Sequence, residues 1–221
     1  MKNAYSAIIL VAGSGSRMGA CRNKIFLTLN GQAIFRYSLD LFLADSDCQQ
    51  VILVGKFDEK AHFEHLLSQR VQFVIGGSER QDSVRNALAV VTQKTVMVHD
   101  GARPFVTASE LSALKKQKNA ILAAPVKDTI KQIIDGKILK TVPREALWGA
   151  QTPQLFETAL IKKVHEMAHK AAFLGTDDAS LVEQFSDVSV TIVQGSYENI
   201  KMTTPEDLIF GQAILANRSD D

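Results

Sequence analysis

An apolar run that breaks into a glycine-containing loop constrains this chain more than any other feature. Residues 7–12, AIILVA, are too few for a helix core and rich in branched side chains, which is typical of a buried strand. Gly13 and Gly15 follow, and glycines let a backbone turn tightly and bring its N–H groups close to an anion. Arg17 and Lys24 add two cations to the same turn. We therefore expect a strand and a loop that bind a triphosphate.

The loop matches neither of two better-known phosphate-binding patterns. The dinucleotide fingerprint G-x-G-x-x-G fails because Met18 stands where the third glycine belongs, and Gly19 comes one residue later. The sequence also contains no G-x-x-x-x-G-K-[S/T] string. A plain strand and turn of an α/β protein, without a ligand, remains an alternative on these residues alone.

Short apolar runs alternate with helical patterns along the rest of the chain. This alternation predicts an α/β fold: a Rossmann-like, mainly parallel sheet with helices on both faces. Ligands bind beyond the carboxyl ends of such strands, and polar residues follow three strands, at 13–19, 76–83 and 99–104. Further strands are predicted at 51–55, 71–75, 95–98, 120–124 and 188–193, and helices at 33–44, 58–69, 79–91, up to about 170, and about 205–216.

Three of the predicted helices begin at a capping pattern. Ser78 and Gln81 match a capping box. Thr176 precedes two acids that suit a helix N-terminus, and Thr204 precedes Pro205 at a first helical position.

Residues 127–147 interrupt the alternation. Two strand-like runs, 129–134 and 137–142, flank Asp135-Gly136, which is the strongest short pattern for a hairpin. A lone hairpin is marginally stable in water, so it needs a surface to pack against. A second subunit and the rest of its own domain are both open as that surface. We predict one domain over residues 1–221, with 127–147 as a β-hairpin arm.

Composition excludes several functions and sets a compartment. The 221 residues carry a net charge of +1, so no broad basic surface for nucleic acid or an anionic membrane is expected. No apolar stretch approaches the roughly 18 residues of a membrane span, and the N-terminal run lacks a cleavage pattern. Cys21 and Cys48 lie far apart and form no metal or redox pair. We expect a soluble, cytoplasmic protein.

One string indicates a different chemistry. His165-Glu166-Met167-Ala168-His169 fits the H-E-x-x-H pattern of zinc proteases and falls on a predicted helix. A catalytic zinc needs a third protein ligand, and no further histidine follows. The zinc interpretation is therefore disfavoured.

Asp100 is the carboxylate best placed for ligand chemistry. It ends an apolar strand at the predicted ligand-binding edge. Mg²⁺ uses few protein carboxylates and keeps several waters, so Asp100 is our candidate metal ligand, directly or through water. A hydrogen bond to a polyol and a simple turn cap before Gly101 are the alternatives.

Taken together, the motifs resemble one family over residues 7 to 212. The chain resembles the 2-C-methyl-D-erythritol 4-phosphate cytidylyltransferases, which are alditol-phosphate cytidylyltransferases of the non-mevalonate isoprenoid pathway. Each motif alone is weak, whereas eight in register are specific. They are the loop at 12–19 with Lys24, 76–80 with 82–84, 99–104, 124–129, 141–144, 147–148 with 151–154, 176–180 and 199–201.

The resemblance implies a role for each matching residue. It implies that the enzyme transfers CMP from CTP to 2-C-methyl-D-erythritol 4-phosphate with a divalent cation such as Mg²⁺, and that it is a homodimer joined through the arm. Arg17, Lys24 and Lys201 would be catalytic, with Lys201 at the α-phosphate. The nucleotide would contact Val11, Ala12, Gly13, Gly15, Gly77, Ser78 and Ser83, and the methylerythritol phosphate would contact Asp100, Arg103 and, from the neighbouring subunit's arm, Thr129 and Arg144.

Four positions depart from the family pattern. Asn23 and Ile25 flank Lys24 where Pro and Gln are usual, so the loop before the lysine is expected to be less rigid. Pro143 and Ser78 each stand where an acid is common. A ribitol-5-phosphate cytidylyltransferase is the nearest alternative function, and a non-catalytic nucleotide-binding protein is a more distant one.

Overall fold

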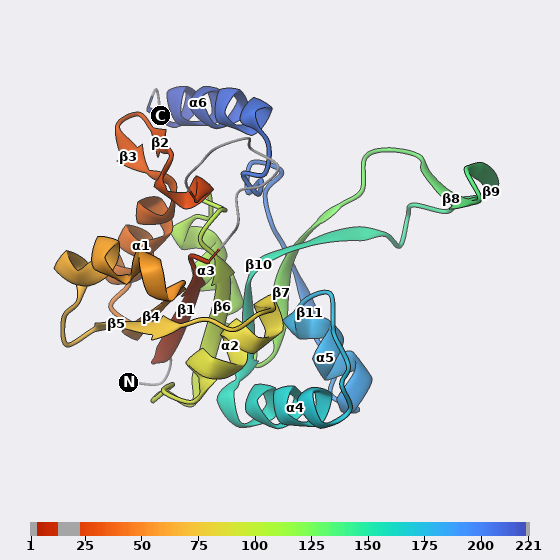
Figure 1. Ribbon diagram of the computed structural model, residues 1–221. Helices are drawn as coiled ribbons and strands as arrows, with labels where there is room; N and C mark the ends of the chain where they lie inside the picture. Colours follow the sequence, from red (N-terminus) through yellow and green to blue (C-terminus); the bar gives the residue numbers. More distant parts are fainter. Residues whose placement is uncertain (1–3, 13–22, 220–221) are drawn as a thin grey trace.

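A seven-stranded sheet organises the chain (Figure 1). The computed structural model describes residues 4–12 and 23–219. The strand order is β11-β7-β10-β6-β1-β4-β5, and every neighbouring pair is parallel except the two that β10 makes with β6 and β7. The predicted mainly parallel sheet is therefore confirmed. The strands are β1 (Tyr5–Leu10), β4 (Cys48–Gly55), β5 (Val71–Ile75), β6 (Thr95–Asp100), β7 (Ala120–Pro125), β10 (Trp148–Glu157) and β11 (Thr191–Gln194).

Helices cover both faces of this sheet, as predicted. The helix α1 and the 3₁₀ segment η3 pack with α3 against one face, and α2, α4 and α5 pack against the other. A small ribbon of β2 (Thr28–Leu29) and β3 (Gln32–Ala33) lies under α6. The bounds are α1 (Ile34–Ala44), α2 (Arg80–Leu88), α3 (Ala108–Leu114), α4 (Thr158–Lys170), α5 (Asp178–Phe185), α6 (Pro205–Ser219), η2 (Lys24–Phe26) and η3 (Phe57–Leu66).

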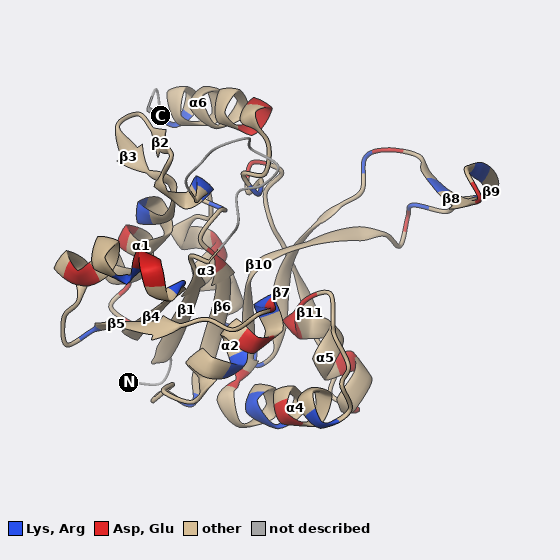
Figure 2. Cartoon of the chain, in the orientation of Figure 1, with Lys and Arg blue, Asp and Glu red and all other residues tan. Residues whose placement is uncertain are grey.

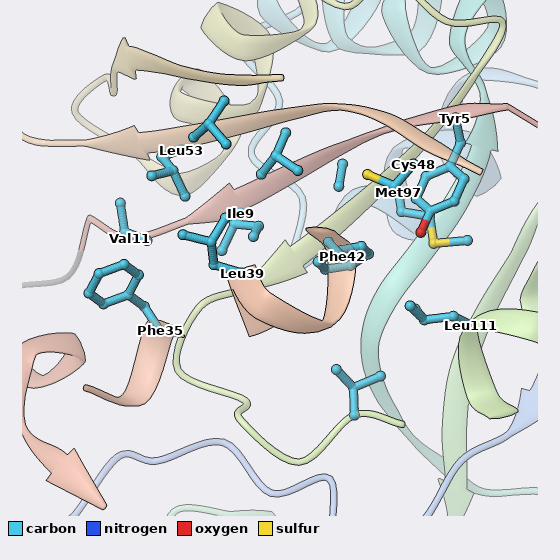
Figure 3. Close-up of a cluster of buried hydrophobic side chains, with 14 of the residues drawn as sticks. Tyr5, Ile9, Val11, Phe35, Leu39, Phe42, Cys48, Leu53, Met97 and Leu111 are labelled. Carbon is cyan, nitrogen blue, oxygen red and sulfur yellow. The ribbon is translucent and has the colours of Figure 1, made fainter. Parts of the chain in front are cut away.

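The central strand β1 shows why its sequence is continuously apolar. Successive side chains of a strand point to opposite faces, and both faces here are covered. Ile9 and Val11 enter the cluster with α1, whereas Ile8 and Leu10 enter the cluster with α2 and α4. Figure 3 shows Ile9 beside Leu39 of α1 on the first of these faces. A one-residue shift in register would move every side chain of this strand to the opposite face, where it would not fit the packing. The position of the strand's carboxyl end is therefore well determined.

Three local predictions are wrong in detail. Residues 57–66 form a 3₁₀ helix, because this segment has no apolar stripe and buries only Phe63. The helix α2 starts at Arg80, with Glu79 as N-cap, whose N–H donates to Asp82. Ser78, the predicted cap, instead donates its hydroxyl to Asp82.

The cap of α5 is also one residue later than predicted. Asp177, rather than Thr176, accepts the N–H of Ser180 at 2.9 Å. A carboxylate at this position stabilises the helix dipole as well as the free N–H group.

The hairpin predicted between residues 127 and 147 is present as β8 (Ile130–Ile134) and β9 (Lys137–Val142). Asp135 and Gly136 have φ of 48° and 74°, which is the conformation that a two-residue hairpin turn needs. The hairpin extends away from the sheet, and most of its residues are exposed (Figure 1). None of the helices in the described segments has the length and hydropathy to cross a membrane.

Candidate active site

The site is built around Asp100, the last residue of β6. Its strand pairs with β1, and the carboxylate lies at the carboxyl edge of the sheet, where it is 8% exposed. The next residue, Gly101, donates its N–H to the carbonyl of Leu10 at 2.9 Å. A Cβ on Gly101 would lie 2.9 Å from that oxygen, so only glycine lets the two strand ends approach this closely. The sequence prediction that Asp100 stands at a ligand-binding edge agrees with this position.

Two cations each bind one oxygen of the Asp100 carboxylate. Arg80 donates its Nε to Oδ1 at 3.3 Å, and Lys201 donates its Nζ to Oδ2 at 2.6 Å. Burial alone would raise the pKa of Asp100, but Arg80 and Lys201 outweigh burial and hold the pKa well below its ordinary value. Asp100 is therefore a permanent anion, unsuited to act as a general acid or base near pH 7. Lys201 is 40% exposed and can reach a ligand beyond the carboxylate.

Arg103 joins the same edge from the loop after β6. Its guanidinium donates to the carbonyl of Asn199 at 2.6 Å. Asn199 is fully buried and donates its own amide to the carbonyl of Thr152 at 3.0 Å. These bonds connect the loop that carries Arg103 to the segment that carries Lys201. The structure thus brings together three predicted site residues, Asp100, Arg103 and Lys201.

His99 supports this loop from inside the protein. Burial, which disfavours the imidazolium, lowers its pKa to about 4, so the ring is neutral at pH 7. Ser38 donates its hydroxyl to the carbonyl of Arg103, which leaves its oxygen to accept from Nε2 of His99 at 3.0 Å. Nδ1 then accepts from the hydroxyl of Thr152, and Thr152 accepts the N–H of Asp100. His99 therefore holds both ends of the segment 100–103, and it is fully buried with both ring nitrogens hydrogen-bonded inside the protein.

The antiparallel strand β10 supplies Thr152 because its ladder is interrupted. Its pairing with β7 shifts register between Ala150 and Gln154. Residues 151–153 leave the regular ladder at this point, and Gln151 donates to the carbonyl of Ser196 at 2.9 Å. The interruption thus turns two side chains of a sheet strand toward the site.

Three of the predicted nucleotide contacts, Gly77, Ser78 and Ser83, lie after the end of β5. Ser83 is buried and accepts the N–H of Gly77 at 3.0 Å, while its hydroxyl donates to the carbonyl of Glu79. A Cβ on Gly77 would come within 2.3 Å of Asp82 Cβ, so the backbone passes α2 too closely for any side chain. Ser83 therefore shapes the Gly76-Gly77 turn, and Gly77 and Ser78 are exposed beside it.

The end of β1 carries the remaining described nucleotide candidates. Val11 is fully buried, and its backbone N–H donates to the carbonyl of Val54 at 2.8 Å. Ala12 is exposed. Asn23, where we expected reduced rigidity, is buried: it donates to the carbonyl of Val11 at 2.8 Å and caps η2, whose first residue is Lys24. The side chain of Asn23 is therefore held by hydrogen bonds on the described side of the loop.

Five predicted site residues remain. Gly13, Gly15 and Arg17 fall outside the described residues. Thr129 and Arg144 flank the hairpin, and Arg144 donates to the carbonyl of Lys127 across its base. The hairpin points away from the edge that holds Asp100 (Figure 1).

The H-E-x-x-H string forms no metal site. His165 is fully buried and bonds to Asp178 at 3.1 Å, whereas Glu166 and His169 are exposed. Within the described parts of the chain, no three His, Cys, Asp or Glu side chains are grouped to hold a metal ion. The charges are dispersed too: Figure 2 shows Lys and Arg interspersed with Asp and Glu over the helices and the hairpin.

Sequence reasoning missed Arg80, His99, Thr152, Asn199 and Asp178 as parts of the site. All five stand inside motifs that carried the family resemblance, but those motifs do not show which side chains meet. Arg80 offered the clearest pattern, since it follows Gly76-Gly77 at the second strand end of the predicted ligand edge.

The comparisons with known proteins identify a family for the chain. The family model for 2-C-methyl-D-erythritol 4-phosphate cytidylyltransferase matches residues 5–217. Proteins of that name from Bacillus mycoides and Halalkalibacterium halodurans are 47% and 46% identical, over 96% and 97% of this chain and 97% and 98% of theirs.

Solved structures give the same result. The 4-diphosphocytidyl-2C-methyl-D-erythritol synthase of Anaerococcus prevotii superposes with a TM-score of 0.84 at 33% identity, over 97% of each chain. The 2-C-methyl-D-erythritol 4-phosphate cytidylyltransferase of Thermus thermophilus superposes with a TM-score of 0.81 at 30% identity, over 96% of this chain and 99% of the other. With a family model that spans nearly the whole chain, and relatives above 45% identity, this protein belongs to the 2-C-methyl-D-erythritol 4-phosphate cytidylyltransferase family.

Proposed function

We propose that the chain transfers CMP from CTP to 2-C-methyl-D-erythritol 4-phosphate, yielding 4-diphosphocytidyl-2-C-methyl-D-erythritol and pyrophosphate for non-mevalonate isoprenoid synthesis. The observation that carries the proposal is the edge at Asp100. There a permanent carboxylate, suited to a polyol, lies 2.6 Å from Lys201, which is suited to a phosphate. Family membership supplies the identity of the two substrates.

The chemistry is a displacement at the α-phosphorus of CTP. A phosphate oxygen of the methylerythritol phosphate forms the new P–O bond, and the bond to the bridging oxygen of the pyrophosphate breaks. The nucleophile is already an anion at pH 7, so the reaction needs no general base. The neutral, buried His99 is consistent with that. The protein instead has to align two anions that repel each other and to stabilise the charge that spreads over the phosphate oxygens.

The cations would act on different parts of the CTP triphosphate. Arg17, Lys24 and the backbone at Gly13 and Gly15 would hold the triphosphate, and Lys201 would neutralise the α-phosphate. In support, Lys24 opens η2 directly after the hydrogen-bonded Asn23, a fixed starting point for its side chain.

The cytosine would lie between the ends of β1 and β5. Val11, Ala12 and Gly77 would line that space with their backbone, with Ser78 exposed and Ser83 accepting the N–H of Gly77. A pocket closed mainly by backbone groups suits a small pyrimidine better than a purine.

A homodimer would complete the methylerythritol phosphate site. Asp100 and Arg103 belong to the sheet edge, whereas Thr129 and Arg144 belong to a hairpin that points away from it. We infer that Thr129 of the partner subunit and Arg144 of the partner subunit bind the substrate phosphate. An exposed apolar set on the hairpin supports its burial against a second subunit: Ile133, Ile134, Ile138 and Leu139, each between 52% and 63% exposed.

Mg²⁺ would bind with the phosphates of CTP. Asp100 is the one carboxylate that our proposed substrate contacts include, and both its oxygens already accept from cations. That donor set fits an ion held mainly by phosphate oxygens and water, with Asp100 as one ligand directly or through water. When bound, the ion neutralises negative charge on the triphosphate. Because both substrates are charged metabolites, we place the reaction in the cytoplasm.

Pyrophosphate release tests the proposal. The purified protein is given CTP and Mg²⁺ with methylerythritol phosphate or with ribitol 5-phosphate, and ATP replaces CTP as a control. Release with methylerythritol phosphate and CTP alone is expected. Release with ribitol 5-phosphate alone would keep the chemistry and overturn the substrate, and no release with either acceptor would overturn the activity.

A further inference from the structure

A line of polar side chains runs from α4 to the site edge. His165 Nε2 lies 3.1 Å from Asp178 Oδ1. The other oxygen of Asp178 accepts from Arg80 Nη1 at 2.8 Å, and Arg80 Nε reaches Asp100 at 3.3 Å. Lys201 closes the line at the second oxygen of Asp100. We call these five residues the polar chain; they come from α4, α5, α2, β6 and the segment before α6.

The inner half of the polar chain is deeply buried. The side chains of His165 and Asp178 are 0% and 1% exposed, among apolar residues of α2, α4 and α5. Burial alone would raise the pKa of Asp178, but Arg80 and the His165 hydrogen bond lower it. A charged carboxylate in such a place is expensive to desolvate, and well-packed apolar residues often serve stability equally well. The fold by itself does not require this pair.

The geometry of Arg80 shows what the pair does. A guanidinium carries five N–H donors in one rigid plane, so engaging two of its sides fixes its orientation. Asp178 holds Nη1, which leaves Nε to face Asp100. If Asp178 released the guanidinium, Arg80 could turn and take both oxygens of Asp100 in a bidentate pair, displacing Lys201.

We propose that Asp178, itself held by His165, is a positioning residue that makes Arg80 bind one oxygen of Asp100 and leave the other to Lys201. Arg80 takes up part of the charge of Asp100, so Lys201 is oriented by the carboxylate without being fully neutralised by it. This inference rests on the proposed roles of Asp100 and Lys201. Neither Asp178 nor His165 touches the substrate in this account; both act through Arg80.

Two neighbours explain how Asp178 keeps its own place. Gln154 of β10 donates to Asp177 at 2.7 Å and accepts the N–H of Ala179 at 3.1 Å. The first turn of α5 is thereby attached to the sheet on both sides of Asp178. His165 then selects the orientation of the carboxylate by binding one oxygen, which leaves the other for Arg80.

The test compares variants within the polar chain with a matched ion pair elsewhere. Asp178→Asn keeps the shape and removes the charge, while His165→Gln retains a hydrogen-bond donor that His165→Leu lacks. The control is Asp45→Asn, which disrupts a partly buried pair with Lys115 at 2.8 Å beside Tyr5, at the other end of β1. The kcat and the KM for each substrate are measured at 25 °C, together with melting temperature.

We expect Asp178→Asn to lower kcat/KM for methylerythritol phosphate about ten- to a hundredfold, the size of a lost hydrogen bond between charged groups. The KM for CTP should change less than about twofold. His165→Gln should retain more activity than His165→Leu, whereas Asp45→Asn should lower the melting temperature and leave kcat/KM unchanged. A structural role alone would not separate the two KM values.

The opposite results would overturn the inference. If Asp178→Asn matches Asp45→Asn in kcat/KM, Asp178 positions nothing. If Asp178→Asn fails to fold, the histidine variants decide the question. An equal kcat/KM for His165→Leu and wild type would refute the positioning role of the polar chain. Asp100→Asn separates this failure from that of the proposed function: an active Asp100→Asn enzyme refutes both, and an inactive one with normal Asp178→Asn refutes only the positioning role.

Discussion

Replacing Gly101 by alanine should damage both stability and activity, because the space beside Leu10 is already full. The new Cβ would lie 2.9 Å from the Leu10 carbonyl oxygen, 3.2 Å from Val11 Cγ1 and 3.3 Å from Ile9 Cγ2. Ordinary contact begins at 3.4 Å, so the strand ends must separate by about half an ångström. They cannot do so freely, since the Gly101 N–H bonds to the same oxygen at 2.9 Å.

The magnitude follows from that displacement. Overpacking of this kind costs about 2 kcal/mol, which lowers the melting temperature of a chain of this length by about 4–8 °C. Asp100 is the neighbouring residue and moves with the backbone. A misplacement of 1 Å can reduce a rate about a hundredfold, so a shift of half that size should reduce kcat/KM about tenfold.

The assay is pyrophosphate release together with thermal unfolding, and Gly149→Ala is the matched control. The nearest atom to a Cβ on Gly149 is the Ala124 oxygen at 3.8 Å, an ordinary contact. This change should leave stability equal or raised by about 0.5 kcal/mol through the unfolded state. If Gly101→Ala melts and turns over like Gly149→Ala, the close-approach argument is wrong.

Three further predictions concern charge, anchoring and pH. Lys201→Ala should lower kcat about 10²–10³-fold with the fold intact, by analogy with the loss of an oxyanion donor. Steady-state kinetics measures the loss and circular dichroism checks the fold; near-normal turnover would show that Lys201 takes no part in the mechanism. Asn23→Ala leaves the buried carbonyl of Val11 without its hydrogen-bond donor at 2.8 Å, which should destabilise the protein by about 1–3 kcal/mol. It should also raise the KM for CTP, because Asn23 positions the neighbouring Lys24. An unchanged midpoint of urea unfolding would show that this hydrogen bond contributes nothing to stability. Burial lowers the pKa of His99 in the folded protein to about 4 from an ordinary 6.5, so the unfolded chain binds more protons between those two pH values. The free energy of unfolding should therefore fall by about 2 kcal/mol as pH drops from 7 to 5. Urea titrations at several pH values check this, and the same pH slope in His99→Gln would refute it.

Local patterns predicted six of the seven strands of the sheet and missed β10, whose apolar pattern is broken by Gln151, Thr152 and Gln154. The run at 71–75 matches β5 at both ends, and Asp135-Gly136 fixed the hairpin turn. The N-cap of α2 was misplaced because Ser78-Gln81 and Glu79-Asp82 are both plausible capping pairs. The Glu79-Asp82 pair is favoured by the close packing of Gly77 against Asp82. That contact belongs to the folded structure and cannot be read from the local pattern.

The site was predictable as an edge but not as a set of contacts. Asp100 could be placed because it ends an apolar strand. Its partner Lys201 is 101 residues away, and its partner Arg80 is oriented by Asp178, 98 residues further along. Such contacts depend on how α2 and α5 pack together, and the spacing of apolar residues along the sequence does not predict that packing.

The antiparallel course of β10 makes the chain's single tryptophan a natural optical probe. Trp148 is the first residue of β10, pairs with Pro125 at the base of the hairpin and is 39% exposed. Four residues later the same strand presents Thr152 to the Asp100 N–H. Docking of the hairpin on a second subunit, as proposed above, would change the surroundings of this indole, so its unlabelled fluorescence should report assembly and acceptor binding through one spectroscopic channel.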